Sequence, residues 1–140
     1  MTCQILYINV SEPDLQLIVN VDCNVIGLFF QDGRMKNSFN NYPELLIMDA
    51  TYKLTNVLMP VYVLLGIGPN GESEIVAVFL TAHEDTASLS QQLRLFKDKN
   101  PAWTAIHTVM TDKDMAERDA ICKLHCCCAY FMCSVPWAVK

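Results

Sequence analysis

The chain has 140 residues, of which 52% are apolar, and a formal net charge of −5. This length predicts one domain with a substantial core. The acidic balance argues against strong DNA binding by the chain alone, because nucleic-acid binders usually carry a basic face. No apolar run reaches the roughly 18–20 residues of a membrane span, and the first residues lack the basic start and cleavage site of a signal peptide.

The chain contains seven cysteines, an odd number, and several are crowded near the C-terminal end. Their spacing does not indicate a set of disulfide bonds. The absence of such a pattern favours a reducing compartment. We therefore expect a nuclear or cytoplasmic protein that is not secreted and does not associate with membranes.

Residues 1–42 are predicted to form β segments and one short helix. Apolar and β-branched residues fill the segments 4–10, 16–21 and 25–30, which favours strands paired as a hairpin or small meander. Apolar side chains then recur at helical spacing from Met35 to Tyr42, which predicts a short amphipathic helix ended by a proline.

Residues 43–140 are predicted to form the core. The core opens with an apolar run from Leu45 to Met48, typical of a strand buried on both faces, and the run ends at Asp49. Because burying an isolated charge is costly, an acid at the end of a central strand is either capped by donors or used in a site. The alternative is an acid at the exposed edge of a strand.

A hairpin and a helix follow. The segments 61–68 and 74–81 are strongly β-like and flank a Pro-Asn-Gly turn, which predicts an antiparallel hairpin. Leucines and a phenylalanine at helical spacing predict a helix over 87–97, capped by Asp85 or Thr86.

A second apolar segment, 105–111, also ends at an acid, Asp112, and a helix is predicted from there onward. The resulting order is β-β-β-α-β-α, in which a helix between strands usually makes a right-handed parallel crossover. If the two strands are parallel neighbours, Asp49 and Asp112 meet at one sheet edge. Paired carboxylates of this kind bind divalent metal ions. Alternatively, Asp112 caps the following helix.

Several motifs, in order, resemble a known family. The sequence DATYKLTN at 49–56 resembles the first-acid signature of Mutator-like (MULE) transposases and their domesticated relatives, including SWIM zinc-finger proteins. Residues 85–88 resemble the entry to the family's helix, and 111–116 its second-acid motif. Within this family, the sequence of residues 29–44 resembles the SWIM zinc-finger proteins most, and the resemblance covers roughly residues 17–123.

The resemblance implies a ribonuclease-H-like (RNase H-like) fold, a mixed α+β/α/β sheet with helices packed on it. In that fold a D-D-E triad binds two Mg²⁺ or Mn²⁺ ions for phosphoryl transfer on DNA. Asp49 and Asp112 match the first two catalytic and metal-binding positions. The third acid is absent, since in the family it lies well past the second Asp, and no C-x-H follows the C-x-C of Cys126 and Cys128. We therefore expect a truncated or alternatively spliced isoform with a vestigial acidic site.

Two functions follow from this resemblance. The first is a non-catalytic scaffold or regulatory module of a nuclear protein, with nuclear proteins or weakly bound DNA as partners and no cofactor in this chain. The alternative is a DDE-type transposase or nuclease core that uses Mg²⁺ or Mn²⁺. An incomplete fold would leave an apolar face uncovered and lower its stability.

Three further groups have two interpretations each. The segment Cys122–Cys133, with His125, either binds zinc or supplies buried thiols. His107 is interpreted as a mid-strand core or face residue. Basic residues form either a loose patch near the second helix or ordinary solvated helix faces; they are Arg94, Lys97, Lys99, Lys113, Arg118 and Lys123.

Overall fold

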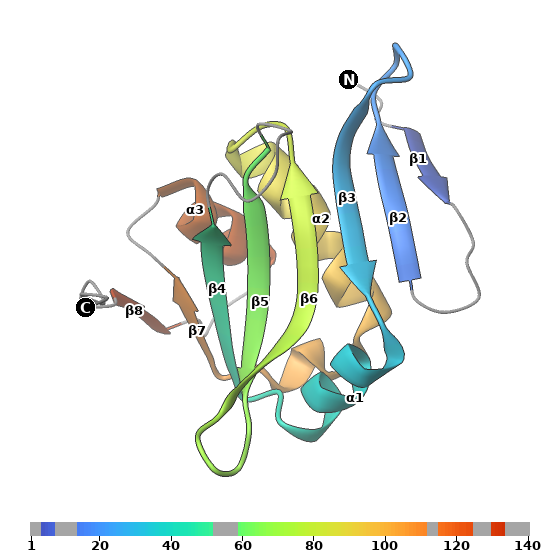
Figure 1. The fold of residues 1–140 in the computed structure, drawn as a ribbon. Coiled ribbons are helices and arrows are strands. Elements are labelled where there is room, and N and C mark those ends of the chain that lie inside the picture. The colour runs from blue at the N-terminus through green and yellow to red at the C-terminus, as the bar shows by residue number, and fades with distance from the viewer. Residues whose placement is uncertain (1–3, 8–13, 52–58, 112–114, 125–129, 134–140) are drawn as a thin grey trace.

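The computed structural model describes residues 4–7, 14–51, 59–111, 115–124 and 130–133. Its strands form one mixed sheet in the order β1-β2-β3-β6-β5-β4-β7-β8 (Figure 1). Neighbouring strands are antiparallel except for the β4–β7 and β7–β8 pairs, which are parallel. The strands are β1 Gln4–Tyr7, β2 Asp14–Val19, β3 Val25–Gln31, β4 Leu45–Thr51, β5 Val61–Ile67, β6 Ser73–Thr81, β7 Thr108–Thr111 and β8 Tyr130–Cys133.

The predicted N-terminal meander is confirmed, and it belongs to the same sheet as the core. Strands β1, β2 and β3 pair antiparallel in chain order. Strand β3 then pairs with β6, with Leu28 opposite Leu80 and Phe30 opposite Val78. The division of the chain after residue 42 stays a prediction, although the sheet is continuous across it.

The helices are α1 Gly33–Asn41, α2 Thr86–Lys99 and α3 Met115–Leu124, with a short 3₁₀ helix at Pro101–Ala105. Two of them begin at aspartates that accept a backbone N–H, from Met35 to Asp32 at 2.8 Å and from Ser88 to Asp85 at 2.7 Å. The backbone hydrogen bond from Ser88 lowers the pKa of Asp85.

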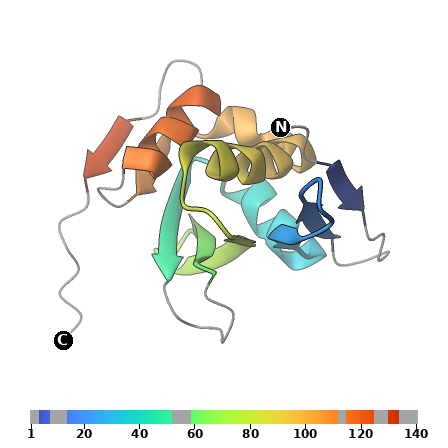
Figure 2. The same cartoon turned by 90° about the horizontal axis from the view of Figure 1, so that it is seen from above.

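The main core lies between one face of the sheet and the helices. Seen from above, α2 and α3 lie on the same side of the sheet (Figure 2). Phe39 of α1 contacts Phe96 of α2 with ring centroids 4.9 Å apart. The ring centroids of Phe96 and Trp103 are 5.7 Å apart. All three rings are buried in one cluster with the inward residues of the strands. The predicted hairpin of β5 and β6 is confirmed, and it contributes the stacked, buried rings of Tyr62 and Phe79 to the core.

Two predictions about β4 are corrected. The strand does not end at Asp49 but continues through Thr51, paired with β5 along this whole stretch. It is also not buried on both faces: Leu46 and Met48 are buried, whereas Leu45 and Ile47 are half-buried. The reason is that the helices described here pack on one side only.

The predicted strand over 105–111 is too long. The structure begins β7 at Thr108 and places a 3₁₀ helix at Pro101–Ala105, where proline fits the first helical turn. His107 therefore precedes the strand and is exposed, so its interpretation as a mid-strand residue is wrong. Its backbone N–H donates to the carbonyl of Glu44.

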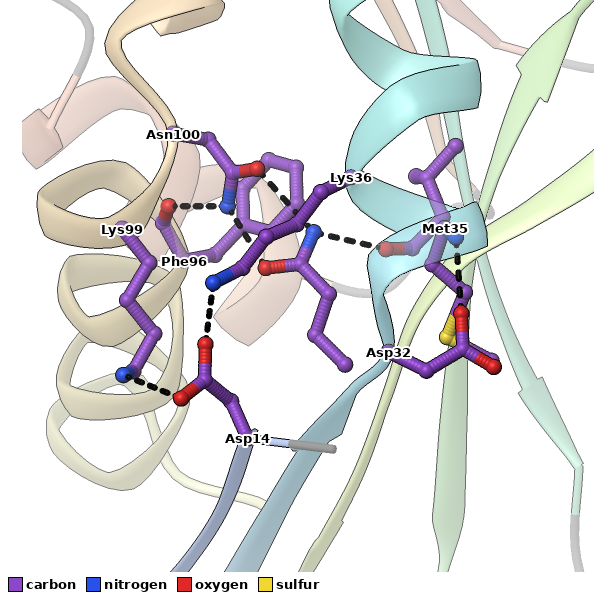
Figure 3. Close-up of polar contacts among 9 residues, drawn as sticks. Asp14, Asp32, Met35, Lys36, Phe96, Lys99 and Asn100 are labelled. Atoms are coloured by element: carbon purple, nitrogen blue, oxygen red, sulfur yellow. Dashed lines mark hydrogen bonds and ion pairs between the residues drawn. The ribbon is translucent and has the colours of Figure 1, made fainter. Parts of the chain in front are cut away.

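Polar contacts join the N-terminal strands to the helices (Figure 3). Gln31 and Asn100 exchange two hydrogen bonds of 3.0 Å, and both side chains are buried. Their remaining amide protons reach the carbonyls of Val76 and Phe96. This pair therefore links β3, β6 and the end of α2.

Ion pairs add to this connection at the surface. Asp14 of β2 pairs with Lys36 of α1 and lies 3.6 Å from the ammonium of Lys99 at the end of α2. The hydrogen bond from Lys36 and the charges of both lysines outweigh partial burial and lower the pKa of Asp14.

Candidate functional site at the ends of β4 and β7

The two strands that carry the predicted acids are neighbours. Strands β4 and β7 pair in parallel, with Ile47 opposite Met110 and Met48 opposite Thr111. The next residues along the chain are Asp49 and Asp112. The parallel adjacency of these strands is thus confirmed, while Asp112 lies outside the described residues. The meeting of the two carboxylates stays a prediction.

Asp49 is an exposed carboxylate on the face of the sheet away from the helices. Its strand neighbours Met48 and Ala50 contact the helix-side core, so alternation directs Asp49 to the other face. There it is opposite Val63 of β5 in an apolar setting. Because Asp49 is exposed, its charge carries little desolvation cost. The cost of burial, from which we inferred that an acid in this strand is capped or used in a site, therefore applies only weakly.

Glu117 is a buried acid that the sequence interpretation did not single out. It lies in the first turn of α3 with 2% of its surface exposed, and it accepts a hydrogen bond from the hydroxyl of Thr111. A signal was present, because Glu117 shares its helical stripe with the buried residues Ala120 and Ile121. This contact ties the end of β7 to the start of α3 across the segment that contains Asp112.

Glu117 does not complete a site with Asp49. Thr111 is opposite Met48, and both are buried on the helix side, where Glu117 also lies. Asp49 projects from the other face of the same sheet. Within the described ranges, no group of three or more His, Cys, Asp or Glu side chains is placed to hold a metal ion. These residues alone do not fit an Mg²⁺ or Mn²⁺ site, so no catalytic step is derived from them.

The cysteine-rich segment is described only in part. Cys122 is an exposed free thiol near the end of α3. His125 and the cysteines at 126–128 lie outside the described residues, so the zinc interpretation stays a prediction. Strand β8, at Tyr130–Cys133, lies at the end of this segment and pairs in parallel with β7.

The basic residues lie on helix surfaces mixed with acids. Lys97 of α2 reaches the backbone carbonyl of Leu124 at 3.4 Å, which brings α2 against the end of α3. Exposed Asp98 and Asp119 interrupt the positive side chains on these helices. Lys113 is outside the described residues. A mixed charged surface favours the interpretation as solvated helix faces.

Among the described helices, none has the length and apolar character needed to cross a membrane.

An antiparallel β6-β5-β4 unit continued by parallel β7 and β8, with helices packed on it, is the architecture of a ribonuclease-H-like domain. Residues 9–126 match the family model described as "Zinc finger SWIM domain-containing protein 1/3, RNaseH-like domain". Because the match covers more than half of the chain, the chain belongs to this family.

Proposed function

We propose that this RNase H-like domain acts as a non-catalytic interaction module in a nuclear protein. The proposal includes an origin from a MULE-type transposase. It binds its partners through surface contacts and requires neither Mg²⁺ nor Mn²⁺.

The separation of acids onto two faces of the sheet supports this proposal. Asp49 is exposed on the face of the sheet away from the described helices, which we call the open face, whereas Glu117 is buried on the helix side and accepts a hydrogen bond from Thr111. A two-metal site needs several oxygen ligands that converge on one point. Asp49 and Asp112 alone would hold a divalent ion weakly, because Mg²⁺ keeps its waters unless several ligands anchor it.

Calorimetric titration with Mg²⁺ and Mn²⁺, together with a plasmid-nicking assay, tests the proposal. The expected result is no saturable metal binding and no metal-dependent nicking by the 140-residue chain. The variants Asp49→Asn and Asp112→Asn should behave like the parent protein. Asp98→Asn, an exposed aspartate on α2, is the matched control for loss of one charge.

The second candidate is a DDE-type nuclease or transposase core acting on DNA. It is favoured by the parallel pairing of β4 and β7, which brings the two acid-bearing strands together. Nicking that disappears in Asp49→Asn and Asp112→Asn but persists in Asp98→Asn would establish this candidate and refute the interaction module. Imaging of a fluorescent fusion tests the nuclear location, and exclusion from the nucleus would contradict it.

A further inference from the structure

The first two strands are held to the rest of the fold differently from the strands beside them. Strand β1 lies at one edge of the sheet and pairs with β2, which in turn pairs with β3 (Figure 1). On the helix side, β2 presents Asp14, Gln16 and Ile18 in alternation. Of these three side chains, only Ile18 belongs to the buried apolar core. The strands β1 and β2 are called the strap.

Two buried amides lie where the strap meets α2. Gln16 and Gln92 are 6% and 1% exposed, and the Oε1 atom of each lacks a hydrogen-bond donor among the described residues. The Nε2 of Gln92 donates to the carbonyl of Leu80 at 3.0 Å. This nitrogen and Ile18 both lie over Gly27, where a Cβ would be 2.6 Å and 3.2 Å from them. Because a buried acceptor without a donor costs free energy and regains hydrogen bonds when water reaches it, opening the strap would recover part of this cost.

Strand β3 is anchored more firmly than β2. Phe29 is fully buried in the core, and Gln31 donates to the carbonyls of Val76 and Asn100. The Oε1 of Gln31 also accepts a hydrogen bond from Asn100. Gln16 and Gln31 are thus buried glutamines on neighbouring strands, and only the second has a donor for its oxygen. The weakest connection of the sheet to the helices therefore lies at β2 and not at β3.

The two ends of β2 fit a latch and a hinge. At one end, Asp14 forms ion pairs with Lys36 of α1 and Lys99 of α2, and its side chain is 34% exposed (Figure 3). At the other end, the register of β2 against β3 shifts after Ile18, which interrupts the ladder. The turn at 20–24 follows and is closed by hydrogen bonds within itself. Separation of β2 from β3 up to the shift would leave these turn bonds intact.

We propose that the strap is a conformational device. Strands β1 and β2 open together from β3 and α2 while the rest of the sheet stays folded, with Asp14 as the latch and the turn at 20–24 as the hinge. Opening exposes Gln16 and the edge of β3 to solvent. It needs neither a partner nor a metal ion, so it goes beyond the proposed function and stands or falls separately from it.

Native-state hydrogen exchange of the full chain, followed by NMR, measures the opening. Amides of the β1–β2 and β2–β3 ladders should exchange with one common opening constant, at least about thirtyfold larger than that of the β5–β6 ladder. A common constant distinguishes opening of a unit from fraying, in which exchange quickens toward the end of each strand. Strap amides as protected as the β5–β6 ladder would contradict the proposal.

A core variant far from the strap tests whether the two openings are separate. Ile121 of α3 is 1% exposed, and Ile121→Val should speed exchange of the β5–β6 ladder about fivefold. Strap exchange should stay unchanged, because the closed and open strap share the same core. Equal acceleration of both ladders would show that the chain opens as a single unit, which would overturn the proposal.

The two buried glutamines provide a matched pair of variants. Gln16→Leu removes the acceptor without a donor and should slow strap exchange about tenfold. Gln31→Leu should instead speed exchange of the β5–β6 ladder about tenfold and leave strap exchange within about twofold, because the open strap keeps the pair of Gln31 and Asn100. Asp14→Asn weakens the latch and should speed strap exchange about threefold. Circular dichroism checks that each variant is folded.

The response to Gln16→Leu decides the role of the buried amide. Strap exchange that this variant leaves unchanged or speeds would mean that the oxygen of Gln16 has a donor in the closed state, and would remove the physical basis of the device. Metal-dependent nicking would refute the proposed function and leave the strap unaffected.

Discussion

The two faces of the sheet use the same strands but have different surroundings. On β3, Phe29 is fully buried beneath the helices, while its neighbour Phe30 is half-buried on the open face. On β4, Met48 belongs to the core and Asp49 is exposed on the other side. The helix side therefore forms the core that holds the fold together, whereas Phe30 and Asp49 on the open face keep contact with solvent. The predictions below concern residues on the helix side and at the N-terminal connection, and the first two compare each residue with a matched position on the open face.

The largest expected effect separates the two adjacent phenylalanines. Phe29→Ala should lower the free energy of unfolding by about 3–5 kcal/mol, because it leaves a cavity in a closed core. Phe30→Ala should cost only about 1 kcal/mol, since its ring is partly hydrated in the folded state. Urea unfolding followed by circular dichroism measures both values. Equal losses would mean that the open face is as closed as the core.

The buried contact between Thr111 and Glu117 should give the next largest effect. Thr111→Val removes a donor from a buried carboxylate and should cost about 1–3 kcal/mol. Thr108→Val, on the same strand but on the open face, should change stability by less than about 0.5 kcal/mol. The same urea titrations compare the two variants, and a smaller loss for Thr111→Val than for Thr108→Val would contradict the assigned role of Glu117.

The amide pair of Gln31 and Asn100 should show strong coupling. Gln31→Leu leaves the buried carbonyl of Asn100 without its donor and should cost about 1–2 kcal/mol. Replacing both residues by leucine should cost less than the sum of the single losses, because no polar group then remains unpaired. A double-mutant cycle in urea measures this coupling, and additive losses would show that the two amides act independently.

Asp14 should contribute the smallest and most pH-dependent effect. Its folded-state pKa is lowered below the ordinary 3.8, chiefly by the hydrogen bond from Lys36. The stabilisation is therefore present above that value and is lost as the pH falls through the folded-state pKa. Since the pair is partly solvated, Asp14→Asn should cost less than about 1 kcal/mol at neutral pH. The difference in urea midpoint between parent and variant should vanish at acid pH, and its persistence there would exclude the ion pair as its cause.

Local patterns in the sequence predicted most elements correctly. The β5–β6 hairpin is confirmed because its turn chemistry is local: Gly71 adopts a φ of 82°, which glycine tolerates. Helix α2 is confirmed because Leu89, Leu93 and Phe96 recur at helical spacing and are all buried. The error at residues 105–107 has a local cause as well, since an apolar stretch after proline fits either a 3₁₀ turn or a strand.

The candidate site was only partly predictable. The sequence indicated two acid-bearing strands and a crossover helix, and the structure confirms that β4 and β7 are parallel neighbours. The sequence did not directly indicate that Glu117 would be buried against Thr111, because that contact depends on how α3 packs against β7. The pairing of Gln31 with Asn100 joins residues 69 positions apart, beyond the reach of any local pattern.

The sequence by itself determined the order of strands and helices and the family to which the chain belongs, since periodicity, turn residues and ordered motifs are properties of neighbouring residues. Tertiary structure alone decided which face of each strand is covered. Alternation separates two sets of side chains, but packing of α2 and α3 on one side makes one set a core and leaves Asp49 among the other.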